Sequence, residues 1–315
     1  MYGGANIRLA GDRMDLTVRI GDVTVSNPVG VASGTFGYGS EYEQLIDLKS
    51  IGALFTKAVT WEPRPGNRIP RIIETTSGLL NSIGLANVGR EGFAKEKYPF
   101  LSGLSCSTFV NVAGNTEDDY ARTVEWLDEH APLTGYELNV SCPNVKEGGL
   151  SIGGSPRMVE VVTRRVRAVT DKPVIVKLTP NVTDITEIAR AAEAAGADAL
   201  SAMNTLVGMV IDVDACRSVL PGKTGGLSGP AVLPVGVAIV YRVSRAVSIP
   251  VIGIGGIDGP DSALQYLLAG ASALQIGTAN FVDPTVTDRV LEGIRSFLSH
   301  HNLTAAGEIA GLLDR

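Results

Sequence analysis

The feature that most constrains the fold is a regular alternation of short apolar runs with helical patterns along a chain of 315 residues. Several runs show no two-residue alternation, which is typical of parallel strands covered on both faces. Eight strands are predicted, at 27–33, 53–59, 107–114, 135–142, 173–180, 197–205, 250–257 and 273–279. Helical patterns lie between them, at 117–130, 155–170, 183–196 and 259–270 among others. Eight β/α units predict an α/β fold, a (β/α)8 TIM barrel forming one domain over residues 1–315, with a doubly wound open sheet as the alternative.

Three segments depart from this alternation. Residues 16–26 alternate polar and apolar side chains and turn at Gly21-Asp22, which predicts an N-terminal β-hairpin at the amino-terminal mouth of the barrel. Two loops, 60–89 and 206–228, are too long to be simple connections. Both follow strand carboxyl ends, where barrel enzymes build their active sites.

Composition excludes several classes of protein. Hydrophobic residues make up 44% of the chain and the net charge is −6, which argues against disorder and against a nucleic-acid binder. The first residues, MYGGANIRLAGDR, lack the apolar segment of a signal peptide, and no apolar run reaches membrane-spanning length. The three cysteines, Cys106, Cys142 and Cys216, are too few and too widely spaced for a disulfide framework. A reduced, cytoplasmic protein is expected.

Polar residues gather at the carboxyl ends of the predicted strands. They are Ser33, Lys57, Asn111, Asn139, Cys142, Lys177, Asn204 and Thr205. No aspartate, glutamate or histidine ends a strand in a position suited to catalysis, so the set fits neither a catalytic metal nor a Cys-His pair. The lysines suit either a Schiff base or the neutralisation of an anionic cofactor. The amides favour the second role, because they match the edges of a planar heterocycle.

Glycines mark the last strands. Gly255 and Gly256 end the seventh strand, Gly277 and Thr278 end the eighth, and GGLSGPA (225–231) precedes a helix. Backbone N–H groups and a helix N-terminus at this corner of a barrel bind phosphate. A phosphate site beside amides and two lysines predicts flavin mononucleotide, FMN.

These pieces form a recognisable series in a fixed order. They include ASGTFGYG (32–39), TKAVT (56–60), NSIGLANVG (81–89), NVSCPN (139–144) and VKLTP (176–180). The chain resembles the dihydroorotate dehydrogenases, flavoenzymes of de novo pyrimidine biosynthesis that oxidise (S)-dihydroorotate to orotate. NVSCPN together with NSIGL is highly specific for that family.

The resemblance also indicates a branch of the family. A cysteine at position 142 is typical of the soluble class 1 branch, and GNRIPRIIET (66–75) with CPNVKEGG (142–149) is most similar to the NAD-linked class 1B enzymes. Those enzymes pass electrons to NAD+ through a second subunit that carries FAD and a [2Fe–2S] cluster. The resemblance therefore implies the catalytic subunit, a homodimer, and a heterotetramer with the electron-transfer subunit. A fumarate-dependent class 1A enzyme is the alternative.

The resemblance implies a role for each site residue. Cys142 is the base that removes the proton from carbon 5 while a hydride leaves carbon 6 for the flavin, and Lys57 contacts both flavin and substrate. The residues implied to bind substrate are Lys57, Asn81, Ser82, Ile83, Gly84, Leu85, Asn139, Asn204 and Thr205. Those implied to bind FMN are Ser33, Lys57, Ala58, Asn111, Asn139, Lys177, Met203, Gly229, Gly255, Gly256, Gly277 and Thr278. Met203 departs from the aliphatic β-branched residue usual there.

Two other functions compete with this one. A phosphate-binding aldolase or isomerase would use Lys177 as a Schiff base and would be colourless. A non-catalytic flavin-binding subunit would be yellow but would not be bleached by dihydroorotate.

Overall fold

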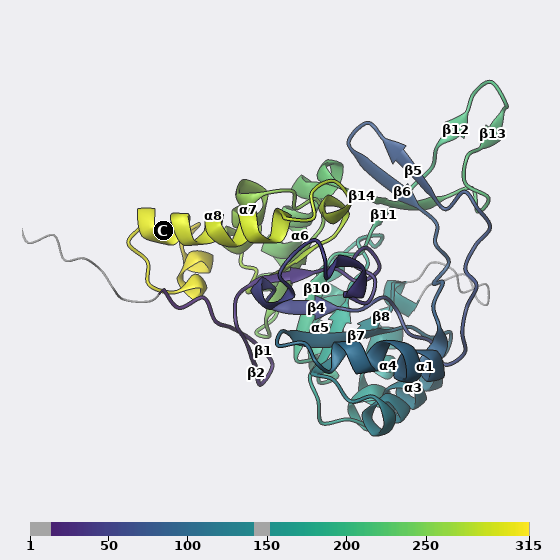
Figure 1. Ribbon diagram of the computed structural model, residues 1–315, viewed down its shortest axis with the longest axis horizontal. Coiled ribbons are helices and arrows are strands. Elements are labelled where there is room, and N and C mark those ends of the chain that lie inside the picture. The colour runs from purple at the N-terminus through teal and green to yellow at the C-terminus, as the bar shows by residue number, and fades with distance from the viewer. Residues whose placement is uncertain (1–13, 142–151, 315) are drawn as a thin grey trace, which may run out of the picture.

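The computed structural model describes residues 14–141 and 152–314. Its centre is a closed barrel of eight parallel strands that pair in chain order, with the last strand pairing with the first (Figure 1). The strands are β3 (Val29–Val31), β4 (Ala53–Phe55), β7 (Ser107–Val112), β8 (Gly135–Asn139), β9 (Val174–Lys177), β10 (Ala199–Ala202), β15 (Val251–Ile254) and β16 (Ala273–Ile276). All eight predicted strands are present, and the (β/α)8 prediction is confirmed.

Every predicted strand extends too far at its carboxyl end. The prediction 27–33 corresponds to Val29–Val31, and 173–180 corresponds to Val174–Lys177. The apolar pattern continues past the paired region because the chain stays buried as it leaves the sheet. Several predicted site residues, among them Ser33, Lys57 and Asn204, lie just beyond these ladders.

Helices surround the barrel as expected, with one exception. They are α1 (Gly89–Gly92), α2 (Tyr98–Leu101), α3 (Glu117–His130), α4 (Pro156–Arg167), α5 (Ile185–Ala194), α6 (Leu233–Ser244), α7 (Pro260–Leu268) and α8 (Val286–His300). Ser155 caps α4 by accepting a hydrogen bond from the Met158 N–H at 3.4 Å. β3 is followed only by two 3-10 turns, η1 (Ser40–Tyr42) and η2 (Leu48–Ser50), so the first β/α unit has no α-helix.

The predicted hairpin is present as β1 (Val18–Ile20) and β2 (Val23–Val25). Its turn lies at the amino end of β10, because a Cβ on Gly21 would come within 2.9 Å of the Cβ of Asp198. Next to the hairpin, the N–H of Asp15 donates to the carbonyl of Thr304 at 2.8 Å. This contact ties the described N-terminal and C-terminal segments together below the barrel.

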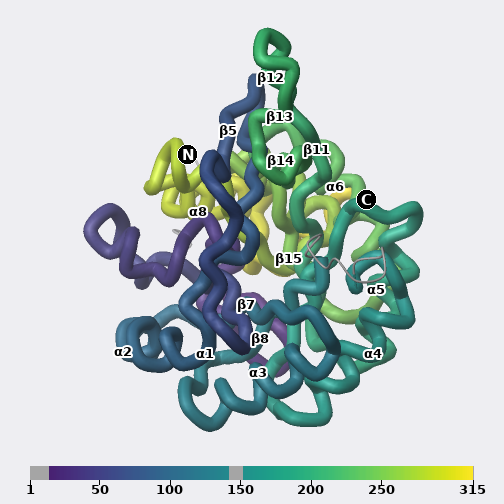
Figure 2. Tube along the Cα trace, turned by 90° about the vertical axis from the view of Figure 1, so that its right-hand side faces the viewer, coloured from purple at the N-terminus to yellow at the C-terminus, as the bar shows by residue number. Residues whose placement is uncertain are grey.

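The two long loops contain strands that the sequence analysis missed. β5 (Ile72–Thr75), β6 (Gly78–Asn81), β11 (Leu206–Gly208) and β14 (Gly225–Ser228) form a four-stranded sheet in the order β11-β14-β6-β5. A second hairpin, β12 (Ile211–Asp212) and β13 (Arg217–Ser218), extends from it. We call residues 69–81 and 206–228 the arm; Figures 1 and 2 show it projecting from the barrel, with β12 and β13 at its tip.

No helix in the described parts of the chain is long and apolar enough to span a membrane.

Candidate active site

A buried polar network lies inside the barrel, directly below the predicted site. Its centre is Glu137 on β8, whose side chain is completely buried. The carboxylate accepts hydrogen bonds from Asn111 Nδ2 at 2.6 Å, Ser201 Oγ at 2.7 Å and Gln275 Nε2 at 2.7 Å. Donors from three other strands, β7, β10 and β16, therefore hold this carboxylate in one position. A buried charge requires such partners, since an unpaired one is very costly.

A chain of amides leads from this network to the mouth of the barrel. Asn139 donates from Nδ2 to Asn111 Oδ1 at 3.4 Å, and Asn204 donates from Nδ2 to Asn139 Oδ1 at 3.3 Å. Asn204 also donates to Ser141 Oγ at 3.1 Å, and its Oδ1 accepts from the N–H of Thr205 at 2.9 Å. The structure thus brings together Asn111, Asn139, Asn204 and Thr205, as the strand-end argument predicts.

Lys177 connects the network to the opposite wall. Its Nζ lies 3.1 Å from Ser33 Oγ, beyond the end of β3, and 3.7 Å from Glu137 Oε2. Its side chain is 5% exposed, so the ammonium is held by protein groups rather than by water. The two predicted residues Ser33 and Lys177 are in contact.

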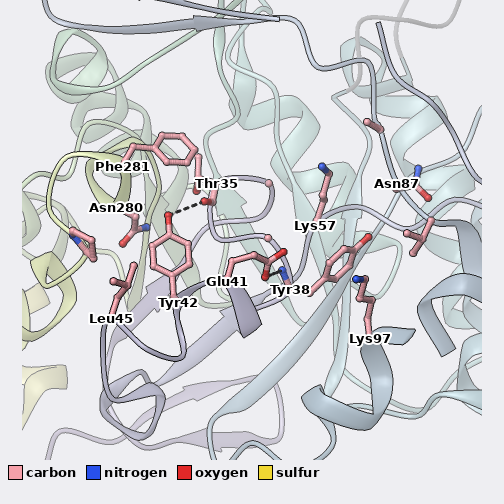
Figure 3. A pocket seen from close by; sticks show the side chains of 15 residues that line it. Thr35, Tyr38, Glu41, Tyr42, Leu45, Lys57, Asn87, Lys97, Asn280 and Phe281 are labelled. Carbon is pink, nitrogen blue, oxygen red and sulfur yellow. Dashed lines mark hydrogen bonds between the residues drawn. The ribbon is translucent and has the colours of Figure 1, made fainter. Parts of the chain in front are cut away.

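Lys57 lies just beyond β4, where it lines an open cavity of about 760 Å³ (Figure 3). Figure 3 shows Lys57, Tyr38 and Lys97 on one side of this cavity and Tyr42, Leu45 and Phe281 on the other. Burial lowers the pKa of Lys57; the charge of Glu41 raises it and that of Arg71 lowers it further. The neighbouring Ala58 is buried, as a residue packed under the mouth should be.

The three glycine-bearing loops meet at one corner. Thr278 Oγ1 donates to Ser228 Oγ at 2.8 Å, which joins the loop after β16 to the end of β14. Gly256 has a φ of +74°, and a Cβ there would come within 2.7 Å of the backbone nitrogen of Leu233, the first residue of α6. Gly229 and Gly255 also have positive φ, of +97° and +122°, and a Cβ on Gly255 would lie 3.7 Å from Met203 Cε. The corner therefore combines glycine backbone of positive φ with the N-terminus of α6, and a helix N-terminus stabilises an anion.

The segment 81–85 begins with Asn81, the last residue of β6 in the arm. Asn81 pairs with Gly226 across the sheet and donates from Nδ2 to its carbonyl at 3.1 Å. Gly226 is packed against Thr205, because a Cβ on Gly226 would come within 2.1 Å of Thr205 Oγ1. Ser82 accepts from Asn67 Nδ2 at 2.9 Å on Oγ. Successive contacts from Asn81 to Gly226, Thr205 and Asn204 connect this segment to the barrel mouth.

Cys142 lies outside the described residues, so its predicted role stays a prediction. Sequence reasoning missed the buried ring of Glu137, Ser201 and Gln275, and also Ser141, whose hydroxyl donates to the carbonyl of Lys177 at 3.0 Å. A glutamate in the apolar run GYELNV was the available signal, since a charge in a buried strand requires partners.

The fold and site define a class of protein. It is a barrel enzyme with a glycine-lined corner at the N-terminus of α6, amides at its mouth, and two partly or fully buried lysines beyond or at its strand ends.

Comparison with known proteins identifies the family. The family model described as dihydroorotate dehydrogenase matches residues 15–298, and the chain belongs to this family. It is therefore an oxidoreductase that converts dihydroorotate to orotate, a step of pyrimidine synthesis, in a flavin-dependent family.

Several relatives are similar over almost their full length. The chain is 48% identical over 300 residues to a protein of Pelobacter propionicus, covering 95% of this chain and 99% of the relative. It is 50% identical over 301 residues to one of Geobacter metallireducens (96% and 99%) and 49% identical over 300 residues to one of Bacteroides thetaiotaomicron (95% and 99%). Each relative is named dihydroorotate dehydrogenase B (NAD(+)), catalytic subunit.

Proposed function

We propose that this chain is the FMN-binding catalytic subunit of an NAD-linked dihydroorotate dehydrogenase of the cytoplasm. The observation that carries the proposal is the continuous hydrogen-bonded series of Asn111, Asn139, Asn204 and Thr205 at the mouth, which Asn111 joins to Glu137 and so to Lys177. The names of the relatives support the NAD-linked branch.

The described residues fit FMN. At the corner, Gly229, Gly255, Gly256, Gly277 and Thr278 offer backbone N–H groups, and the close contact of Gly256 with α6 leaves no room for a side chain. Asn111, Asn139, Lys177 and Ser33 form a polar floor that suits the edge of a planar ring. We assign Ala58 and Met203, both buried, to packing beside it. When bound, the flavin supplies the acceptor of the hydride from carbon 6.

The chain's own residues do the remaining work. Asn139, Asn204 and Thr205, with Asn81, orient the pyrimidine ring of the substrate, and residues 82–85 enclose its carboxylate. Lys57 binds that carboxylate, since a partly buried ammonium attracts an anion strongly. Cys142 removes the proton from carbon 5, a general-base role for which a thiol pKa near the working pH is most effective.

The partner assignment rests on the number of cysteines available to hold an iron–sulfur cluster. A [2Fe–2S] cluster needs four protein ligands, usually cysteines, and the whole sequence has three cysteines. We therefore assign FAD and the cluster to a separate electron-transfer subunit, in a heterotetramer built on a homodimer. Exposed apolar side chains support protein contacts, on the arm (Ile69, Val207, Val213) and near the cavity rim (Leu45, Phe281, Val282).

One spectrum tests the proposal. The purified chain is expected to be yellow and to be bleached by anaerobic dihydroorotate. A colourless protein that borohydride traps with its substrate would instead select the aldolase or isomerase. A yellow protein that dihydroorotate does not bleach would select a non-catalytic flavin carrier, and reoxidation by fumarate would select the class 1A enzyme.

A further inference from the structure

Glu137 and Lys177 form an unusual pair within the described part of the chain. They are the only buried acid and the only buried base among the Asp, Glu, Lys, Arg and His side chains there. Charged side chains are almost never fully buried unless they are paired.

The contacts of Glu137 leave its charge fixed in place. Three neutral donors, Asn111, Ser201 and Gln275, hold its two oxygens at 2.6–2.7 Å. No donor of this set carries a charge, so the negative charge of Glu137 is oriented but not neutralised by them. Among residues 14–141 and 152–314, the cation paired with it is Lys177, at 3.7 Å.

Lys177 is shared between Glu137 and the mouth of the barrel. Its 3.7 Å separation from Glu137 Oε2 is longer than a hydrogen bond, whereas its hydrogen bond of 3.1 Å is to Ser33 Oγ. The ammonium therefore points past the carboxylate toward the face where the proposed function places the flavin. A charge pair at this distance in a dry interior interacts strongly.

We propose that Glu137 is a positioning residue that sets the reduction potential of the bound flavin by counterbalancing Lys177. A cation below the ring stabilises the extra negative charge of the reduced flavin, and charge near the ring tunes its electronics. The carboxylate of Glu137 offsets part of that attraction and keeps the potential lower than Lys177 alone would set. By accepting from Asn111 Nδ2, Glu137 also turns Asn111 Oδ1 toward Asn139 and so fixes the direction of hydrogen bonding along the amide chain. This inference rests on the proposed function.

The first test is the potential of the flavin in matched variants, measured by equilibration with a redox dye at pH 7. Glu137→Gln keeps the size and removes the charge, and it should raise the preference for reduced over oxidised flavin about tenfold, which is about 30 mV for two electrons. Glu137→Asp keeps the charge, and its flavin potential should differ from the wild-type potential by less than half of that shift. Lys177→Met should shift the potential downward.

A second variant pair keeps the inference testable if Glu137→Gln does not fold. Replacing a buried ion pair by apolar side chains of similar size is often tolerated. The double variant Glu137→Met/Lys177→Met should have a higher potential than Lys177→Met alone, because it removes the unpaired carboxylate. A purely structural role would lower the melting temperature of all Glu137 variants without any shift in potential that follows the charge.

The outcomes are distinguishable from failure of the proposed function. A wild-type chain without flavin, or one not bleached by dihydroorotate, overturns the proposed function and this inference with it. A wild-type chain that is bleached, with Glu137→Gln at the wild-type potential or below it, overturns only the role of Glu137.

Discussion

Lys57 is the site residue whose charge depends most directly on its surroundings. Its pKa is lowered chiefly by burial. In the proposed function the protonated form binds the carboxylate of orotate, so affinity should be full below this lowered pKa and should fall as pH rises through it. Lys57→Met should weaken orotate binding roughly thirtyfold, about 2 kcal/mol, and should remove the pH dependence. Titration of orotate by flavin absorbance between pH 6 and 10 measures both effects.

The control for Lys57 is a lysine on the same cavity. Lys97→Met removes a cation from the cavity lining, at 5.5 Å from the ring of Tyr38, but leaves Lys57 in place. It should leave the affinity for orotate within about twofold. Equal losses in both variants would mean that general positive charge, rather than Lys57, attracts the substrate.

Cys142 carries the proton transfer in the proposed reaction. General-base catalysis contributes about a hundredfold to ten-thousandfold. Cys142→Ser should slow flavin reduction by at least about a hundredfold, and the rise of the rate toward the thiol pKa, about 8.5 when unperturbed, should move to higher pH. Anaerobic stopped-flow reduction by dihydroorotate gives the rate at each pH.

The matched control for Cys142 is Cys216→Ser. Cys216 is an exposed free cysteine on the turn between β12 and β13, and its variant should keep the wild-type rate and profile. A Cys142→Ser protein with an unchanged rate and profile would show that another group takes the proton.

At the residue scale the sequence predicts amides well and Glu137 poorly. Asn111, Asn139 and Asn204 are recognisable because each lies at or near the carboxyl end of a predicted strand. Glu137 lies two residues before Asn139, inside the strand. Its hydrogen bonds come from Ser201 and Gln275, which are 64 and 138 residues away in the chain. Contacts between distant strands are set by barrel closure, which a local pattern does not encode.

At the scale of elements the barrel strands follow from local pattern, whereas the arm does not. The barrel strands are buried runs rich in β-branched residues, for example PVIVK at 173–177. β11 pairs with β14 and β14 with β6, so the arm sheet joins two loops that lie far apart in the sequence. Its strands are three or four residues long and half exposed, and their pairing is settled by tertiary contacts.

The glycine corner gives a prediction at this scale. Gly256→Ala would place a Cβ 2.7 Å from the Leu233 nitrogen in a backbone conformation of φ +74°. Forcing an L-residue into that conformation costs about 1–2 kcal/mol, and the added Cβ displaces the start of α6. We expect the variant to lose at least about tenfold in FMN affinity. Flavin release followed by fluorescence, together with thermal unfolding, measures the two effects.

Gly196→Ala is the matched control for the corner. Gly196 has a φ of +94° just after α5, and a Cβ there would meet only Arg167 side-chain atoms, at 3.3 Å or more. The Gly196→Ala variant should have a free energy of unfolding lower by a similar amount, about 1–2 kcal/mol, and should keep its flavin. Loss of flavin in both variants would trace the effect to stability and not to the corner.

At the scale of the whole molecule, the proposed function gives substrate oxidation to this chain and the use of NAD+ to a second protein. Each dihydroorotate delivers two electrons, and three cysteines are too few for the cluster that would carry them onward. The chain alone, given dihydroorotate and NAD+ without oxygen, should be bleached once and form no NADH. Addition of the electron-transfer subunit should give continuous NADH formation at 340 nm, because that subunit returns the flavin to its oxidised form. Fumarate in place of the subunit is the control and should leave the flavin bleached. Steady NADH formation by the chain alone would show that its own flavin reacts with NAD+, and the assignment of FAD and the cluster to a partner would then be wrong.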